Sequence, residues 1–319
     1  MFRTEISRRT VIGGIAATAA IAPFARTMAA ERPGGFLIVG DWGRDGAQHQ
    51  RDVAVQMGKA ATELGSRFVM SVGDNFYENG VQSASDPQWQ SSFEQVYTDP
   101  ALQIPWYVAL GNHDYRGVPQ AQLDYAGRSH RWKMPARYYK LSGAEIGLPG
   151  VDLFAIDSSP LVHQYRDKVD APIAANVKGQ DTAAQLAWLD RELGASTAPW
   201  RLVYGHHTIR SGGSQHGETP ELVELVRPLL ERYGVQAYIN GHDHDMQHIS
   251  DGGVDYICCG AGSEVRPVKL VKGTKFCVSR SGFGAISVEG DALSLQFRDY
   301  TGATVYDAKI ARERAAVAA

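Results

Sequence analysis

The sequence has few cysteines, and their spacing is not that of a metal site. The 319 residues include three of them: Cys258, Cys259 and Cys277. Because neighbouring residues of a strand point to opposite faces, Cys258 and Cys259 cannot both bond to one partner. We expect buried free thiols, with a disulfide from one of the pair to Cys277 as the alternative.

The chain also lacks a basic excess, and its body lacks a long apolar run. A formal net charge of −3 does not indicate a nucleic-acid binder or a basic membrane-surface protein. No uncharged run after the N-terminal segment is long enough to span a bilayer. Internal repeats, low-complexity linkers and domain boundaries are not apparent either. We therefore expect one domain over residues 31–319, a disordered tail at 311–319, and a monomer.

Residues 1–30 have the composition of an export signal. A basic segment that includes Arg8 and Arg9 precedes an apolar stretch over 11–22, and small residues around Ala30 offer a cleavage site. The string S-R-R-T-V-I around the two arginines resembles a twin-arginine signal. We expect a protein exported to the periplasm or secreted, with a plain secretory signal or a retained anchor as alternatives.

Short apolar runs that alternate with helical patterns predict an α/β core. Buried strands are predicted at Phe36–Gly40, Phe68–Val72, Trp106–Leu110, Leu153–Ile156, Leu202–Tyr204 and Val235–Ile239. Helices are predicted over 47–64, 181–193 and 220–233, the last bent at Pro228. Only short strands follow, from Met246 to about Ile310. This order favours sheets packed between helices.

Polar residues that can bind metal directly follow five of the predicted strands. They are Asp41, then Asp74 and Tyr77, then Asn112, His113 and Asp114, then His206 and His207, and finally His242 and His244. In a parallel-type sheet the carboxyl ends of the strands meet at one edge. One such residue in a loop would be ordinary surface polarity. Five groups together predict a metal site in one cleft.

The order of these groups resembles that of the metallophosphoesterases, the calcineurin-like superfamily. The matching blocks are D-x-G, G-D-x-x-Y, G-N-H-D, V-x-x-H and G-H-x-H, beginning at Asp41, Gly73, Gly111, Val203 and Gly241. Tyr77 makes the chain similar, more narrowly, to purple acid phosphatases of the small tartrate-resistant type. The resemblance extends from about Phe36 to Tyr306. It implies a sandwich of two mixed β-sheets flanked by helices.

The resemblance implies a dinuclear centre of Fe(III) and a divalent metal, which could be iron, zinc or manganese. The ferric ion would be bound by Asp41, Asp74, Tyr77 and His244. The divalent ion would be bound by Asp74, Asn112, His206 and His242, with Asp74 as the bridge. Carboxylates and a phenolate suit a trivalent ion, whereas an amide and imidazoles suit a divalent one. A phenolate bound to iron would colour the protein.

The resemblance further implies hydrolysis of phosphate monoesters at acid pH by a metal-bound hydroxide. His113 would bind the substrate and protonate the leaving group, and His216 would be a second cleft histidine on a mobile Ser/Gly-rich loop. Asp114 could orient His113 or be a surface carboxylate, and His216 could be a solvated loop residue. His207 is expected to support the site, because the V-x-x-H spacing selects His206 as the metal ligand.

The expected substrates are small-molecule phosphate esters and, as an extension, phosphoproteins; neither a nucleic acid nor a membrane span is expected. Three other functions stay open. They are a phosphodiesterase or nucleotide pyrophosphatase on the same metal pair, generation of reactive oxygen species by an iron pair, and a non-enzymatic metal-containing binding protein. The presence of His113 beside the full ligand set disfavours the last, because a binding protein needs no proton donor.

Overall fold

The computed structural model describes residues 1–2, 34–167 and 171–312. The signal segment expected at 1–30 lies outside these residues apart from its first two, and so does the expected tail from residue 313 on. The following account concerns the unit Arg32–Ala319. None of the helices in the described ranges combines the length and the apolar character needed to cross a bilayer.

Within the described residues the strands form two seven-stranded sheets. The first has the order β14-β13-β12-β1-β2-β3-β4 and the second the order β11-β9-β10-β8-β7-β6-β5. The first consists of β1 (Gly35–Val39), β2 (Ser66–Val72), β3 (Trp106–Ala109), β4 (Trp132–Lys133), β12 (Gly282–Glu289), β13 (Ala292–Asp299) and β14 (Thr304–Ala311). The second consists of β5 (Tyr139–Leu141), β6 (Val151–Ala155), β7 (Trp200–Tyr204), β8 (Ala237–Asn240), β9 (Met246–Asp251), β10 (Val254–Cys259) and β11 (Thr274–Val278).

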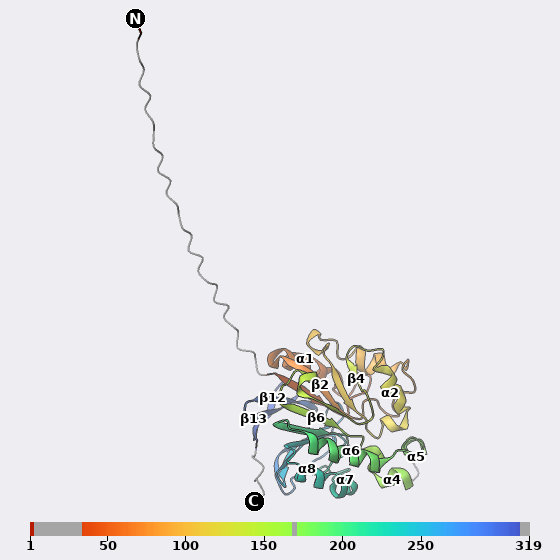
Figure 1. The fold of residues 1–319 in the computed structure, drawn as a ribbon. Coiled ribbons are helices and arrows are strands. Elements are labelled where there is room, and N and C mark those ends of the chain that lie inside the picture. The colour runs from red at the N-terminus through yellow and green to blue at the C-terminus, as the bar shows by residue number, and fades with distance from the viewer. Residues whose placement is uncertain (3–33, 168–170, 313–319) are drawn as a thin grey trace, which may run out of the picture. The chain divides into compact units, whose positions relative to one another are not determined.

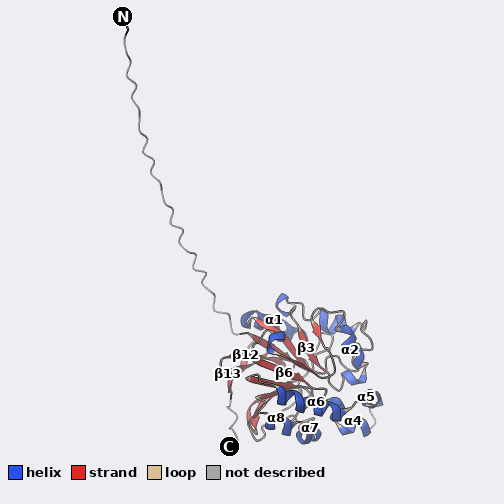
Figure 2. Cartoon of the chain, viewed as in Figure 1, coloured by secondary structure: helices blue, strands red, loops and turns tan. Residues whose placement is uncertain are grey.

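Both sheets are mixed. Strands β1 to β4 pair in parallel, as do β6, β7, β8 and β10, whereas the hairpin strands β9 and β11 to β14 add antiparallel edges. Parallel strands need helical crossovers, and helices flank the two sheets (Figures 1 and 2). The expected sandwich of two mixed sheets between helices is therefore present.

The core has two layers, because the central strands are buried on both faces. In β1, Phe36 and Ile38 point into the space between the sheets, whereas Leu37 and Val39 pack toward the helices. Phe36 stacks on Phe68 of β2 with ring centroids 4.7 Å apart. A continuous apolar run, in place of an alternating one, is the sequence pattern of such doubly covered strands.

The longer helices lie where the sequence predicts, with ends that differ by up to three residues. The helices are α1 (Gln50–Leu64), α2 (Pro119–Tyr125), α3 (Gly143–Ile146), α4 (His163–Asp167), α5 (Ala171–Val177), α6 (Thr182–Ala195), α7 (Pro220–Leu225) and α8 (Arg227–Arg232). Asp181 caps α6 by accepting from the Ala184 amide at 2.9 Å. The helix predicted over 220–233 is two helices, because the chain breaks at Val226, just before Pro228 in the first turn of α8.

The three cysteines are free thiols. Cys258 on β10 and Cys277 on β11 both align with Gln247 of the intervening β9, one from each side. Two strand spacings of about 4.8 Å separate them, which is more than a disulfide spans. The alternative of a disulfide to Cys277 is therefore excluded for Cys258 by the sheet order.

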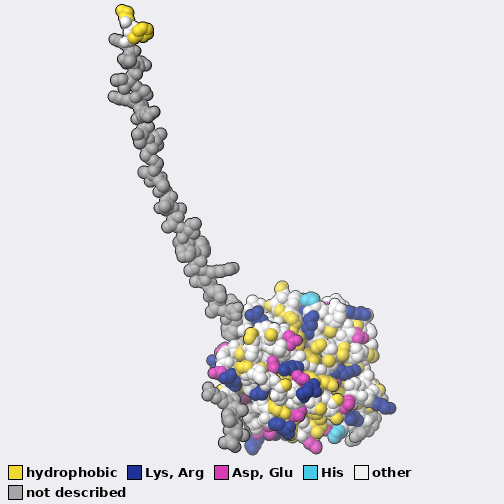
Figure 3. All heavy atoms as spheres, in the orientation of Figure 1, with side chains coloured by type: hydrophobic (Ala, Val, Ile, Leu, Met, Phe, Trp, Pro, Cys, Tyr) yellow, Lys and Arg dark blue, Asp and Glu magenta, His cyan; other side chains and the backbone are white. Residues whose placement is uncertain are grey.

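Charge of either sign is dispersed on the face of the unit drawn in Figure 3, where Lys and Arg side chains alternate with Asp and Glu. A single basic patch is not seen on that face. This distribution agrees with the small net charge of −3.

Candidate metal centre

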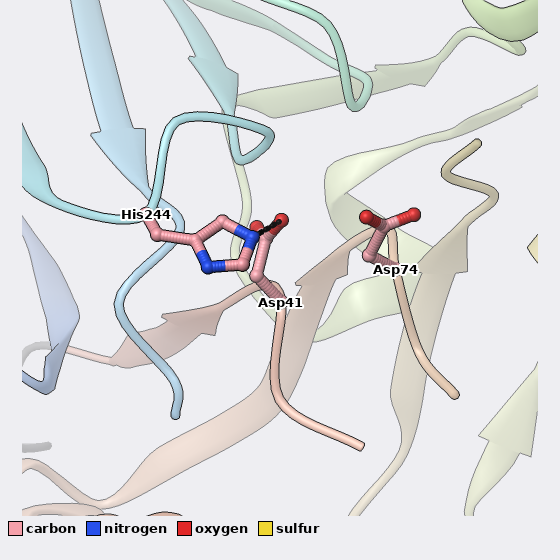
Figure 4. A group of neighbouring side chains, drawn as sticks. All are labelled: Asp41, Asp74 and His244. Carbon is pink, nitrogen blue, oxygen red and sulfur yellow. Dashed lines mark ion pairs between the residues drawn. The ribbon is translucent and has the colours of Figure 1, made fainter. Parts of the chain in front are cut away.

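The ends of five strands bring the predicted ligands to one edge of the sandwich. Asp41 and Asp74 follow β1 and β2, and Asn112 follows β3, all in the first sheet. The histidines come from the second sheet: His206 follows β7, and His242 and His244 follow β8. Figure 4 shows Asp41, Asp74 and His244 converging from separate strand ends. The site thus lies where the carboxyl ends of strands from both sheets meet.

Several of the predicted ligands occupy backbone conformations that side-chain-bearing residues rarely adopt. The φ angles of Asp41, Asp74 and His242 are 59°, 49° and 71°, in the left-handed region. Such conformations persist where the surroundings hold them and are common at functional sites. Glycines make room beside the carboxylates, because a Cβ on Gly111 would lie 2.1 Å from Asp74 Oδ1 and one on Gly241 would lie 2.2 Å from Asp41 Oδ2.

The first cluster surrounds the hydroxyl of Tyr77. This hydroxyl lies 3.1 Å from Asp41 Oδ1, 2.9 Å from Asp74 Oδ2 and 3.1 Å from His244 Nε2. His244 Nε2 is also 3.4 Å from Asp41 Oδ1. The ligating atoms of the two aspartates and His244 all lie within 4.8 Å of one another. These four residues are the ones that the resemblance assigns to the ferric ion.

The second cluster surrounds Nε2 of His206. This nitrogen lies 3.4 Å from Asp74 Oδ2, 3.1 Å from Asn112 Oδ1 and 3.2 Å from His242 Nδ1. Asp74 Oδ2 is therefore the atom that the two clusters share. The four residues are those that the resemblance assigns to the divalent ion.

The donor atoms fit a pair of cations. The Tyr77 hydroxyl has one hydrogen but three neighbouring acceptors, so it cannot donate to all of them. The donor atoms of the first cluster lie 2.9–3.4 Å from one another, which is the spacing of ligands that share an ion at about 2.0–2.2 Å. Asp41 and His206 are fully buried, and a buried anion needs a positive partner. Burial, with Asp41 and Asp74, raises the pKa of Tyr77, so only a strong Lewis acid would hold it as phenolate. Burial lowers the pKa of His206, but the neighbouring Asp74 raises it by more, so that the pKa of His206 is about 9.

His113 lies at the edge of the clusters with its ring against Tyr77, the centroids 4.4 Å apart. Its backbone amide donates to Asp74 Oδ1 at 2.8 Å, and its Nδ1 is 2.7 Å from the Glu78 carbonyl. Nη1 of Arg116 lies 3.1 Å from the same Nδ1 and 3.4 Å from Nε2. His113 is thus beside the predicted metal ligands, and its side chain is mostly buried.

His216 stacks on the predicted ligand His242 with ring centroids 4.0 Å apart. Nη1 of Arg266 lies 3.1 Å from its Nε2, and its backbone amide donates to Asp243 Oδ1 at 3.3 Å. The preceding loop, which the sequence predicts to be mobile, is paired with the chain near Val268 through a β-bridge at Gly213. His216 is exposed but packed, so it is not a freely solvated loop residue.

Asp114 is not at the surface, contrary to one expectation, and its hydrogen bonds go to groups other than the His113 ring. It is 1% exposed and accepts from the amides of Gly111 at 2.8 Å and Asn75 at 3.1 Å. The side chain of Gln122 donates to it at 2.8 Å. Burial and the nearby Asp74 raise its pKa to about 7. Asp114 therefore fastens the loop after β3 to the loop after β2.

His207 is buried, with its ring centroid 5.0 Å from that of His206 and 4.4 Å from that of His242. Ser158 Oγ lies 2.8 Å from its Nδ1 and the Tyr165 hydroxyl 3.0 Å from its Nε2. Both ring nitrogens are thus engaged, which agrees with a supporting place for this residue. His206, the neighbour that the V-x-x-H spacing favours, is the one whose Nε2 lies beside Asp74 and Asn112.

Sequence reasoning missed the polar residues that hold the ligand loops. Asn75 links Asp114 to the Ala109 carbonyl and accepts from Ser71 at 2.5 Å. Asp243, between the predicted ligands His242 and His244, accepts from the amides of His216 and Gly217 and from the hydroxyl of Ser211. Both occupy variable positions inside the G-D-x-x-Y and G-H-x-H blocks. Their polarity next to ligands was the signal available.

A two-sheet sandwich with metal-competent residues at its carboxyl edge defines a metallophosphoesterase. Residues 35–246 match the family of calcineurin-like phosphoesterases. Purple acid phosphatase 4 of Arabidopsis thaliana is 37% identical over 281 residues, covering 85% of this chain and 81% of the relative. Human tartrate-resistant acid phosphatase type 5 is 33% identical over 300 residues, covering 87% of this chain and 90% of the relative.

Solved structures agree on the fold. GAP50, described as the anchor in the inner membrane complex of Plasmodium, superposes with a TM-score of 0.74 at 24% identity, covering 88% of this chain and 89% of the other. The chain belongs to the purple acid phosphatases, a family of calcineurin-like phosphoesterases that are acid phosphatases with a dinuclear metal centre.

Proposed function

We propose that this chain hydrolyses phosphate monoesters at acid pH with Fe(III) and a divalent ion in its two clusters. The observation that carries the proposal is the sharing of Asp74 Oδ2 between the Tyr77 hydroxyl at 2.9 Å and His206 Nε2 at 3.4 Å. One carboxylate between two donor sets is the arrangement that offsets repulsion between neighbouring cations.

The chemistry of the donors supports the division between the metals. Asp41, Asp74, Tyr77 and His244 would hold Fe(III), and Asp74, Asn112, His206 and His242 would hold divalent iron, zinc or manganese. When bound, the ions supply Lewis acidity for a phosphate oxygen and lower the pKa of water. Three oxygen donors that can carry negative charge surround the first position, which suits a trivalent ion. The donors of the second position are mostly neutral, which suits a divalent ion.

His113 is proposed to hold the substrate and to give a proton to the leaving oxygen. The Glu78 carbonyl can only accept, so Nδ1 of His113, 2.7 Å away, carries a hydrogen. Nε2, which is then the atom that can accept from Nη1 of Arg116 at 3.4 Å, is the ring atom proposed to exchange a proton with the substrate. His216, on the opposite side against His242, is proposed to contact the substrate as well. Asp114 is proposed to act only by positioning the loop that bears His113.

The remaining parts of the proposal concern the protein's surroundings. Residues 1–30 are proposed to direct export through the twin-arginine route and to be removed, leaving one catalytic domain that acts as a monomer in the periplasm or outside the cell. Small phosphate esters are the proposed substrates, with phosphoproteins as an extension. The face drawn in Figure 3 offers no single basic patch to a polyanionic partner.

Metal analysis tests the proposal. Protein purified without chelator should contain two metal ions per chain, of which one is iron, and a chelator should abolish hydrolysis of an aryl phosphate. Iron together with zinc or manganese should restore it. Full activity with one metal ion, or with two ions and no iron, would contradict the proposed centre.

A further inference from the structure

The guanidinium of Arg44 lies over the ring of the tyrosine of the first cluster. Its guanidinium carbon is 3.9 Å from the centroid of the Tyr77 ring. The side chain is 12% exposed, so little water separates the cation from the ring. A cation over an aromatic face interacts with the ring's π electrons, and most strongly where water is excluded.

Two carboxylates fix the guanidinium in this place. Nη1 is 2.6 Å from Glu78 Oε1, and Nη2 is 2.9 Å from Glu264 Oε2. The two glutamates come from distant parts of the chain and approach the guanidinium through different nitrogens. Because both terminal nitrogens are held, the plane of the guanidinium cannot easily leave the ring.

The backbone adds to this restraint. The Tyr77 amide donates to the Gly43 carbonyl at 2.9 Å, and the Arg44 amide donates to Gln50 Oε1 at 3.1 Å. The loop after β1 is thus tied both to the tyrosine and to the first turn of α1. Nε of Arg44 is buried without a hydrogen-bond partner among the described residues. The placement therefore favours contact with the ring over complete hydrogen bonding of the guanidinium.

A merely structural ion pair would not need this geometry. Glu78 and Glu264 are 63% and 39% exposed, and pairs with exposed partners contribute little to stability. Both could bind an arginine that projects into solvent. The contact with Tyr77 is what sets this arginine apart.

We propose that Arg44 is a positioning residue that sets the electron density of the Tyr77 ring and thereby the colour of the iron-bound protein. The inference rests on the proposed binding of Fe(III) by Tyr77. Absorption of visible light would move an electron from the phenolate ring to the ion. A cation beside the ring stabilises the electron-rich ground state more than the electron-poor excited state. Loss of the cation should therefore lower the transition energy.

The test is the visible spectrum of Arg44→Met, measured on the full-length mature protein at equal iron content. The absorption maximum should move to longer wavelength by on the order of 10 nm or more. Arg51→Gln is the matched control: it removes the same charge from the same segment, and Arg51 donates to the Gln95 carbonyl instead of facing Tyr77. Its spectrum should equal that of the wild type.

Arg44→Lys covers the case in which the methionine variant does not fold. An ammonium retains the charge but cannot stack as a plane or hold both glutamates, so a smaller shift in the same direction is expected. An unchanged maximum in either folded Arg44 variant, or an equal shift in Arg51→Gln, would overturn the inference while leaving the proposed function intact. A colourless wild-type protein that contains Fe(III) would overturn the Tyr77 assignment and this inference with it.

Discussion

The hydroxyl of Tyr77 lies 3.1 Å from Nε2 of His244, although 167 positions separate the two residues in the sequence. The tyrosine comes from the loop after β2 in one sheet, and the histidine from the loop after β8 in the other. Their contact joins the two halves of the sandwich at the first cluster. A cation bound there would fasten both sheets together.

Tyr77→Phe should remove the visible colour of the iron-loaded protein, because the phenolate would be the only ring donating charge to iron. Tyr97→Phe is the control, since the Tyr97 hydroxyl is also buried but has no hydrogen-bond partner among the residues described. Absorption spectra of both variants at equal iron content check this. Colour retained in Tyr77→Phe would remove Tyr77 from the ligand set.

His113→Ala should lower kcat about 10²- to 10⁴-fold, because a positioned proton donor is lost. The loss should be larger for an alkyl phosphate than for a nitrophenyl phosphate, whose leaving group needs less protonation. Steady-state kinetics on both esters measure it, with the exposed His130→Ala as the control. Equal losses on the two esters would argue against proton donation.

Asp114→Asn should destabilise the protein by about 2–3 kcal/mol, because an amide NH₂ would face the N–H groups that Asp114 now accepts. Metal affinity should fall about 10- to 100-fold, since both loops bearing Asp74 and Asn112 lose their link. Urea unfolding and metal titration measure these changes. Asp124→Asn, at an exposed position, should change neither.

Asp157 should make stability depend on pH away from the metal centre. Burial raises its pKa to about 6, against a usual value of 3.8, so the folded state binds a proton more readily than the unfolded chain between these values. The contribution of Asp157 to the free energy of unfolding is fully present below about pH 4. It is lost as the pH rises through 6, which lowers the free energy of unfolding by up to about 3 kcal/mol.

Urea unfolding of wild type and Asp157→Asn at pH 4 and pH 7 measures this contribution. The difference in unfolding free energy between the two pH values should be smaller in the variant, because asparagine has no proton to lose. The same pH dependence in both proteins would show that Asp157 is not the group responsible.

The sequence predicted the central strands and the residues at their ends, because buried strands are continuous apolar runs and the ligand loops follow them directly. It did not predict the strands β4 and β5 or the short helices α2 to α5, because these elements contain too few residues to show a periodic pattern. Nor could it orient Asp114, whose direction depends on Asn75 and Gln122 in other segments.

The contact of Arg44 with Tyr77 shows the same limit. The two residues lie on loops after neighbouring strands, and only the folded sheet brings the guanidinium over the ring. Linear spacing specifies which residues follow a strand. It does not specify which side chains from different strands will touch.

The central claim is that the shared-carboxylate centre hydrolyses phosphate monoesters in acid. The most direct test compares the rates of an aryl phosphate monoester and the matching diester, from acid to alkaline pH, on the mature metal-loaded protein. We predict preference for the monoester with an optimum in the acid range. Preference for the diester with an alkaline optimum would contradict the proposal and favour a phosphodiesterase on the same two clusters.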